Sequence, residues 1–370
     1  MRAVIVTNRV KRYVNGFKSM IEPLMELGYE VIWVADFTQF KEDLSLIPCK
    51  IYQTDFRSNP FNPNNLKAYS QLLKLLKQEP VDLMHCNTPI GGLIGRLCAK
   101  RAKVKKVIYT AHGFHFYKGA PFINRTLFKW GEKYLAHYTD ILLTINQEDF
   151  NAAQSFKLRN NGQIFLIHGA GVDTGYINTY DPRKKRKEIG IPDSSIVIFS
   201  AGELNKNKNN QAIIKAISKV NNKNIYYVLC GEGKLRPKLE NLSRDLGISE
   251  RVKFLGFRTD VLDILPATDI FAMPSFREGL PRSLMEAMDA GLPCIVSNIR
   301  GNVDLIEDGV GGFLRSPTDI SGYSKAIEML ATNQELRKRF GETNKENVRT
   351  YDIENVKSEL KDIYSSINRI

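Results

Sequence analysis

The chain has 370 residues, 43% of them hydrophobic and 25% charged, so it is too long for one ordinary hydrophobic core and is not a disordered or low-complexity protein. Its five cysteines are scattered and include no Cys-x-x-Cys pair, which indicates neither a disulfide framework nor a zinc site. The net charge is +13, and residues 1–175 hold most of the excess, with 23 basic and 14 acidic side chains. A basic first half suits a phosphate-bearing ligand, an anionic membrane surface or nucleic acid, or is simply a soluble basic surface.

The first apolar run is too short for a signal peptide, and we expect it to form a buried strand at Ala3–Thr7. Similar runs follow along the chain, separated by stretches whose apolar residues recur at helical spacing. The predicted strands are Val31–Ala35, Leu83–Cys86, Lys106–Thr110, Ile141–Thr144 and Ile164–Ile167, and the predicted helices include Gly16–Leu27 and Leu66–Gln78. This alternation predicts an α/β domain with a doubly wound parallel sheet.

A second series of the same kind predicts a second domain with its own core. Its strands are expected at Ile196–Ser200, Ile225–Leu229, Val252–Leu255, Ile270–Met273 and Cys294–Val296. We place the boundary near residue 176, which gives domains 1–176 and 177–352. Residues 353–367 have a helical apolar period, so the stretch 353–370 would be able to pack back on the first domain. No apolar run reaches the roughly 18–20 residues that span a bilayer, so we do not expect an integral membrane protein. The scattered cysteines fit a reducing cytoplasm.

The segment richest in chemistry is FAMPSFREGLPRSLMEAMDAGLPCIVS, residues 271–297. It predicts a strand ending at Met273, a turn shaped by Gly279 and Pro281, and a helix over Ser283–Asp289. Such a turn presents free backbone N–H groups and the positive end of a helix dipole, which suits a diphosphate.

Two glutamates, Glu278 and Glu286, flank the start of this helix with seven residues between them. One carboxylate would lie at each end of an elongated, polyhydroxylated ligand, where it would accept hydrogen bonds from vicinal hydroxyl groups. The alternative is that Glu286 is a solvated helix residue and Glu278 a loop charge.

The stretch SAGELNKNKNN has the same form: a strand ends at Ser200, a polar loop follows, and a helix starts at Asn209. Lys208 lies at the mouth of this helix and would pair with a phosphate, as Lys206 also would. The alternative is that both are ordinary surface lysines.

A third predicted strand, which ends at Thr110 in YTAHGFHFYKG, is followed by His112 in a turn next to a glycine. His112 would face a crevice and form a hydrogen bond with a ligand hydroxyl or carbonyl group, whereas His115 is less well placed. The alternative is a structural histidine.

Aromatic and basic side chains are interleaved downstream of His112. They are Phe114, Phe116, Tyr117, Phe122, Phe128 and Trp130, with Lys118, Arg125, Lys129 and Lys133. This mixture suits a membrane interface. The alternative is a helix that packs its aromatic side chains into the core.

These segments together resemble the retaining GT-B glycosyltransferases of family 4 over nearly the whole chain. The matching stretches are EGLPRSLME with the following AMDAGLPCIVS, then GNVDLIEDGVGGFL, CGEGKLRPKLE and RVKFLGF, in the order and spacing of that family. The versions TAHGFHFYKGAP and GELNKNKN are similar to those of bacterial enzymes that build lipid-linked polysaccharide precursors. The resemblance implies two Rossmann-like domains facing across a cleft, an N-terminal acceptor domain and a C-terminal donor domain.

By this resemblance, Glu286 binds the nucleotide ribose, Glu278 contacts the donor sugar and Lys208 contacts the diphosphate. The backbone N–H groups of Gly279 and Leu280 would meet the same ligand.

The resemblance also implies that His112 faces the donor sugar from the first domain and that Gly16 lies beside the phosphates. Phe257 and Arg258, after the strand Val252–Leu255, would hold the base.

One position departs from the family pattern, because Glu203 stands where the family usually has a phosphate-binding arginine. We hypothesise that Arg282 supplies the missing charge and also pairs with Glu203. No Asp-x-Asp triplet occurs, so cationic side chains and a helix dipole would stabilise the leaving group, and activity is expected without metal or cofactor.

The subfamily resemblance implies a UDP-sugar donor, carrying a hexose or N-acetylhexosamine, and a polyprenyl-diphosphate-linked saccharide acceptor. The enzyme would then work peripherally on the inner face of the membrane. A nicotinamide-dependent oxidoreductase would need Gly-x-Gly-x-x-Gly after the first strand, and the sequence lacks it. A UDP-sugar epimerase and a non-catalytic sugar-nucleotide-binding protein remain open. No nucleic-acid-binding module appears, so no nucleic-acid partner is expected.

Overall fold

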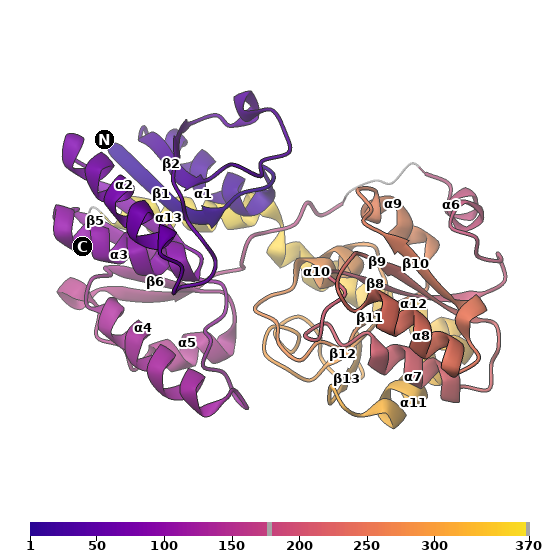
Figure 1. The fold of residues 1–370 in the computed structure, drawn as a ribbon. Helices are drawn as coiled ribbons and strands as arrows, with labels where there is room; N and C mark the ends of the chain where they lie inside the picture. Colours follow the sequence, from indigo (N-terminus) through magenta and orange to yellow (C-terminus); the bar gives the residue numbers. More distant parts are fainter. Residues whose placement is uncertain (176–179, 368–370) are drawn as a thin grey trace. The chain divides into compact units, whose positions relative to one another are not determined.

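The computed structural model describes residues 1–175 and 180–367 (Figure 1). The chain forms two compact units, and we call them the N-terminal unit, Met1–Gly171 with the residues from Asp352 onward, and the C-terminal unit, Val172–Tyr351. The boundary expected near residue 176 falls outside the described residues. The structure divides a few residues earlier, between Gly171 and Val172.

The N-terminal unit is built on a seven-stranded parallel sheet with the order β3-β2-β1-β4-β5-β6-β7. The strands are β1 (Arg2–Arg9), β2 (Glu30–Asp36), β3 (Lys50–Gln53), β4 (Leu83–Asn87), β5 (Lys106–Ala111), β6 (Ile141–Thr144) and β7 (Gln163–Leu166). The central strands are almost continuously apolar because helices cover both faces of a sheet of this type. The doubly wound prediction is confirmed.

Six α-helices accompany this sheet in the described residues. They are α1 (Asn15–Glu26), α2 (Asn64–Gln78), α3 (Pro89–Ala102), α4 (Lys129–Ala136), α5 (Gln147–Ala153) and α13 (Ile353–Ser366). Helix α3 packs on β1, β4 and β5, whereas α1 packs on β1 and β2.

The last of these helices, α13, belongs to the unit formed by the start of the chain (Figure 1). The carboxylate of Asp352 caps its first turn, and α13 lies against α1. Two ion pairs tie the helices together, Lys357 to Glu22 at 2.7 Å and Lys361 to Glu26 at 2.7 Å. The C-terminal helix therefore completes the N-terminal unit.

A buried hydrogen-bond chain joins α13 to the sheet. His85, on β4, has no exposed surface, and its Nδ1 atom lies 2.7 Å from the hydroxyl of Tyr364. The Nε2 atom lies 2.8 Å from the hydroxyl of Thr110 on β5. Burial lowers the pKa of His85 to about 3, with a smaller contribution from His112, so the ring is neutral when the protein is folded.

The C-terminal unit is built on a six-stranded parallel sheet with the order β10-β9-β8-β11-β12-β13. The strands are β8 (Ile196–Ala201), β9 (Ile225–Cys230), β10 (Val252–Gly256), β11 (Ile270–Met273), β12 (Cys294–Ser297) and β13 (Gly312–Arg315). Its helices are α6 (Pro182–Glu188), α7 (Gln211–Lys219), α8 (Arg236–Asp245), α9 (Val261–Ile264), α10 (Arg282–Asp289), α11 (Ile320–Thr332) and α12 (Gln334–Asn347).

Alternate residues of β8 serve the two cores of this unit. Ile198 joins a cluster with residues of α7 and α11, whereas Val197 and Phe199 join a cluster with Leu284 and Met285 of α10. Helix α10 is thereby fixed against the sheet on one side, which positions its other side for a ligand.

Two strands were not predicted from the sequence. Strand β3, KIYQ, lies at the sheet edge and is largely exposed, so it lacks an apolar run. Strand β13, GFLR, is also an edge strand, and only its first two residues are buried. The predicted helix ends are off by one or two residues, for example at α7, which begins at Gln211 instead of Asn209. In the described residues, no helix is long and apolar enough to span a bilayer.

Candidate functional site

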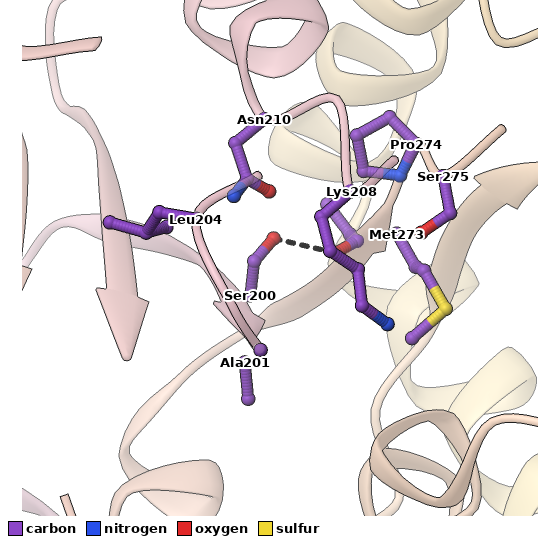
Figure 2. A pocket seen from close by; sticks show the side chains of 10 residues that line it. Ser200, Ala201, Leu204, Lys208, Asn210, Met273, Pro274 and Ser275 are labelled. Atoms are coloured by element: carbon purple, nitrogen blue, oxygen red, sulfur yellow. Dashed lines mark hydrogen bonds between the residues drawn. The ribbon is translucent and has the colours of Figure 1, made fainter. Parts of the chain in front are cut away.

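In the C-terminal unit, the strand order reverses between β8 and β11, so the loops that follow these two strands diverge. Ligands of open parallel sheets bind where such loops separate. Figure 2 shows the hollow that results, with Ser200 and Ala201 at the end of β8 on one side and Met273, Pro274 and Ser275 on the other. The side chain of Lys208 extends between the two sets of residues.

Hydrogen bonds hold the two loops together. Asn209 Nδ2 donates to the carbonyl of Pro274 at 3.0 Å, and Asn207 Nδ2 donates to the carbonyl of Arg277 at 2.9 Å. The backbone N–H of Phe276 donates in turn to the carbonyl of Asn207 at 2.8 Å. The polar loop expected from GELNKNKN is therefore fixed to the loop that carries Glu278.

Lys208 reaches the site by passing over Gly202. The φ angle of Gly202 is +146°, which disfavours other residues, and a Cβ atom built there would lie 3.1 Å from Cε of Lys208. The lysine Nζ lies 2.8 Å from Oε1 of Glu278, and both side chains are largely buried. The Nε atom of Arg300 also donates to the backbone carbonyl of Glu278, at 3.2 Å. Because Gly202 has no side chain, the Lys208 side chain is able to pass over it and reach Glu278.

The second charge pair lies on α10, where Nε of Arg282 donates to Oε1 of Glu286 at 2.8 Å. Burial raises the pKa of Glu286, and the neighbouring Arg282 offsets part of that rise. The carboxyl group of Asp173 raises the pKa further by a smaller amount.

A pocket of about 570 Å³ brings these groups together. Five predicted residues line it: Lys208, Glu278, Leu280, Arg282 and Glu286. Seven further lining residues were not predicted as ligand contacts: Ala201, Gly202, Thr259, Val261, Leu262, Pro281 and Ser283. Gly202 could have been found from its place directly after a buried strand. Val261 and Leu262 could not have been predicted as ligand contacts, because apolar residues are expected in the hydrophobic core.

Five other predicted residues lie elsewhere in this unit. Glu203 is exposed and does not line the pocket, and Lys206 lines a separate hollow beside Lys238. Phe257 is also exposed and outside the lining. Gly279 is half-buried and lies outside the lining, between the lining residues Glu278 and Leu280.

Arg258, the fifth, forms ion pairs with Glu188 at 2.6 Å and with Asp260 at 2.5 Å. It sits beside Thr259, which does line the pocket.

The expected pairing of Arg282 with Glu203 is wrong. Arg282 pairs with Glu286, which lies four residues later on the same helix and therefore on the same side of it. Glu203 is exposed.

The two remaining predicted residues belong to the N-terminal unit. His112 follows β5, is exposed, and places Nε2 2.6 Å from Oδ1 of Asn87, at the end of β4. Gly16 lies in the first turn of α1, where a Cβ atom would come within 3.1 Å of Ala170. Both lie at the carboxyl edge of their sheet. The strand-end argument had placed His112 there, whereas Gly16 was expected from the family resemblance alone.

The pocket of the C-terminal unit combines two cations with two carboxylates beside the first turn of α10. The cations and the helix N-terminus suit a diphosphate, and the carboxylates are able to accept hydrogen bonds from hydroxyl groups. Within the described ranges, no three His, Cys, Asp or Glu side chains group as a metal site.

Sequence and structure comparisons agree on the kind of protein that this chain resembles. Residues 181–347 match the profile of "Glycosyl transferases group 1" and residues 15–175 that of "Glycosyltransferase Family 4". A putative glycosyltransferase, EpsD of Bacillus subtilis (strain 168), is 35% identical over 322 residues, covering 85% of this chain and 84% of the relative.

An Escherichia coli relative is named UDP-Gal:alpha-D-GlcNAc-diphosphoundecaprenol alpha-1,3-galactosyltransferase. It is 31% identical over 309 residues, covering 81% of this chain and 79% of the relative. The crystal structure of Anabaena Alr3699/HepE in complex with UDP and glucose superimposes with a TM-score of 0.80 at 18% identity, covering 99% of this chain and 100% of that one. The architecture of the two units is that of the GT-B fold.

Proposed function

The chain belongs to the family 4 glycosyltransferases, and from this we propose that it moves a hexose or N-acetylhexosamine from a UDP-sugar to a lipid-linked saccharide, with retention at the anomeric carbon, in bacterial surface polysaccharide synthesis. The observation that carries the donor half of this proposal is the pocket that joins Lys208, Arg282, Glu278 and Glu286. The acceptor half rests on the named activity of the Escherichia coli relative.

In this proposal the C-terminal unit binds the donor. Lys208 holds the diphosphate together with Arg282, and the N–H groups of the turn at Gly279 and Leu280 approach the same phosphates. Glu286 accepts hydrogen bonds from the ribose hydroxyls, and Glu278 accepts them from the donor sugar.

The base would lie toward the β10–α9 loop, beside Phe257 and Arg258. The ion pairs of Arg258 with Glu188 and Asp260 hold that loop in shape, and Thr259 of the loop lines the pocket. The N-terminal unit binds the acceptor and contributes His112 and Gly16 to the donor sugar and phosphates.

The chemical step would be a displacement on one face of the sugar. The bond between the anomeric carbon and the β-phosphate oxygen breaks, the acceptor hydroxyl oxygen bonds to the same carbon, and its proton passes to the leaving phosphate. Lys208, Arg282 and the first turn of α10 would stabilise the charge that develops on the nucleoside diphosphate. With these cations at the leaving group, we expect the reaction to proceed without a divalent metal.

The glutamates serve as ligands instead of nucleophiles in this scheme. Each is engaged by a cation, Glu278 by Lys208 and Glu286 by Arg282, at 2.8 Å in both pairs. These pairs orient the two carboxylates before a donor binds, which suits the recognition of a diol.

We propose a polyprenyl-diphosphate-linked saccharide as the acceptor. The name of the Escherichia coli relative specifies a sugar on diphosphoundecaprenol, and the first half of this chain carries the larger basic excess. A lipid-linked acceptor would place the enzyme peripherally on the inner, cytoplasmic face of the membrane. No nucleic-acid partner is part of this proposal.

The test is thermal stabilisation of the purified protein in EDTA by UDP, GDP, ADP, NAD and a panel of UDP-sugars. We expect stabilisation by uridine nucleotides in the wild-type protein and its loss in Glu286→Ala. Stabilisation by NAD alone would overturn the proposal. Product analysis with the best donor then separates transfer to an acceptor from epimerisation of the donor or its hydrolysis.

A further inference from the structure

One helical segment of the N-terminal unit turns large apolar side chains to solvent. Residues 122–136 are helical and comprise a π-helical turn, Asn124–Phe128, that continues into α4 (Figure 1). The exposed fraction is 73% for Phe122, 64% for Ile123, 58% for Leu127, 66% for Trp130 and 44% for Tyr134. From Ile123 onward these residues recur every three or four positions, so they form one continuous strip along the helix. We call them the apolar strip.

The opposite side of the same segment fixes it to the domain. Leu135 and Ala136 are buried in the unit, and Oε2 of Glu132 pairs with Nη2 of Arg96 on α3 at 2.8 Å. The helix therefore does not need the apolar strip for its own packing.

The aromatic residues upstream behave differently. Phe114 and Phe116 stack on each other at 4.6 Å between ring centroids and are buried in the domain core. The sequence alone could not divide the aromatic residues of this stretch into a buried set and an exposed set, whereas the structure does.

Basic side chains accompany the apolar strip. Lys118, Arg125 and Lys133 are exposed and Lys129 is half-buried, and Arg125, Lys129 and Lys133 recur every four positions. In the part of the chain that the structure describes, none of these four forms an ion pair with a carboxylate. The one acidic residue within 117–136 is Glu132, which is engaged by Arg96.

We propose that residues 122–136 lie in the surface of an anionic lipid bilayer, with the apolar strip inserted among the acyl chains and the basic residues at the phosphate level. A helix with an apolar strip, lysines and arginines beside it and exposed Trp and Tyr has the composition of an interfacial helix. This inference rests on the proposed function, whose acceptor carries a lipid. A second copy of the chain would also cover the strip, but it would bring two sets of unpaired cations together.

The position of residues 122–136 explains how a contact with the bilayer would help the acceptor to reach the enzyme. Asn124 Nδ2 donates to the backbone carbonyl of His115 at 3.1 Å, and the ring of Phe128 stacks on that of His115 at 5.3 Å. His115 lies three residues after His112, at the carboxyl edge of the sheet. A bilayer bound at the strip would therefore lie next to the loop where the proposed acceptor, anchored in the same bilayer, has to arrive.

The first test is flotation of the full-length protein with phosphatidylcholine vesicles, with and without phosphatidylglycerol. We expect binding to the anionic vesicles and about tenfold weaker binding for the triple variant Phe122→Ser, Leu127→Ser, Trp130→Ser. A similar loss is expected for Arg125→Gln, Lys129→Gln, Lys133→Gln, and more so as salt rises. The matched control is Phe61→Ser, Leu66→Ser, which removes two exposed apolar side chains elsewhere in the unit and should leave binding unchanged.

Tryptophan fluorescence provides the second measurement. The chain has two tryptophans, Trp130 in the strip and Trp33, which is fully buried. Anionic vesicles should shift the emission to shorter wavelengths in the wild-type protein, and Trp130→Phe should abolish the shift.

Three results would overturn the inference: equal binding to neutral vesicles, unchanged binding of the strip variant, or sedimentation showing that the strip instead mediates self-association. The thermal unfolding of every variant is followed by circular dichroism, which reports whether the substituted N-terminal unit is folded, and stabilisation by UDP is measured on the wild-type protein. Because lipid binding is read without turnover, a failure here is separate from a failure of the proposed function, which would show as an absent UDP effect in the wild-type protein.

Discussion

The Nζ atom of Lys208 lies 2.8 Å from Oε1 of Glu278. The cation proposed to hold the diphosphate is thus paired with the carboxylate proposed to hold the sugar. When a UDP-sugar binds, Glu278 gains sugar hydroxyls as partners in exchange for the lysine. When UDP alone is bound after the reaction, Glu278 has no sugar to contact and competes with the phosphates for Lys208.

We therefore expect Glu278→Gln to bind UDP more tightly and to transfer sugar more slowly. Releasing Lys208 from a pair of this kind is worth about 1 kcal/mol, or about fivefold in the dissociation constant of UDP. Calorimetric titration of UDP and steady-state turnover measure the two effects. Glu328→Gln, an exposed carboxylate of the same unit, makes the same charge change and serves as the control. Unchanged UDP affinity would show that the pair does not govern product binding.

Arg282→Ala should weaken UDP binding by about tenfold, because a charge-assisted contact to phosphate is lost. The neighbouring Arg277, which is exposed and outside the pocket lining, is the matched control, and Arg277→Ala should bind UDP normally. If Arg282→Ala retained full donor affinity and turnover, Arg282 would not replace the arginine missing at Glu203.

Binding of UDP should also depend on the raised pKa of Glu286. The ionised carboxylate accepts hydrogen bonds from both ribose hydroxyls, whereas the protonated form does so poorly. As pH falls through the raised pKa, affinity should decline at a higher pH than an ordinary glutamate would give. In Arg282→Ala the cation that opposes this rise is absent, so the decline should begin at a still higher pH. Titrations across the acidic range test this, with Glu286→Gln as the control that lacks this carboxyl group and retains the pH dependence of the UDP phosphates.

Gly202→Ala should reduce both stability and UDP affinity. The positive φ angle of Gly202 is unfavourable for alanine, and the new Cβ would displace the Lys208 side chain. Gly247 also has a positive φ angle, +65°, but a Cβ atom there meets nothing within 4 Å. Gly247→Ala should therefore lower the melting temperature without affecting UDP binding. Equal UDP affinity in the two variants would contradict the proposed path of Lys208.

The buried His85 should make the N-terminal unit sensitive to acid. Its pKa is about 3 when folded and near 6.5 when unfolded, so below pH 6.5 the unfolded chain binds a proton that the folded one does not. The free energy of unfolding should fall with decreasing pH over this range, by up to about 1.4 kcal/mol per pH unit from this group.

His85→Gln removes the titration while keeping a side chain that is able to form hydrogen bonds to Tyr364 and Thr110. Urea unfolding at several pH values should show lower stability near neutral pH but a shallower decline in acid. A slope equal to that of the wild-type protein would assign the acid sensitivity to other groups.

Turnover should persist in EDTA, because Lys208, Arg282 and the helix N-terminus carry the charge of the leaving group in the proposed step. Loss of turnover that a divalent ion restores would show that a metal takes part.

The sequence predicts those features of the fold and of the site that neighbouring residues in the chain determine, and it does not predict those that only the tertiary structure determines. Glu278, Glu286 and Lys208 lie on strand–loop–helix units whose geometry the apolar pattern sets, so the sequence predicted their convergence at one sheet edge. The partner of Arg282 was predicted wrongly, since Glu286 on the same helix turn competes better than the distant Glu203. The pocket residues Val261 and Leu262 carry no chemical signature, and only the tertiary arrangement brings them to the pocket.

The path of the chain through the two units also determines the order in which they are able to fold. Residues 1–171 emerge from the ribosome long before α13, yet α13 covers α1 and supplies the hydroxyl of Tyr364 to His85. The C-terminal unit is a continuous segment and can fold as soon as it is synthesised, in effect as a domain inserted into the other. The N-terminal unit is therefore synthesised first but completed last. A nascent chain that ends before α13 lacks the helix that completes this unit.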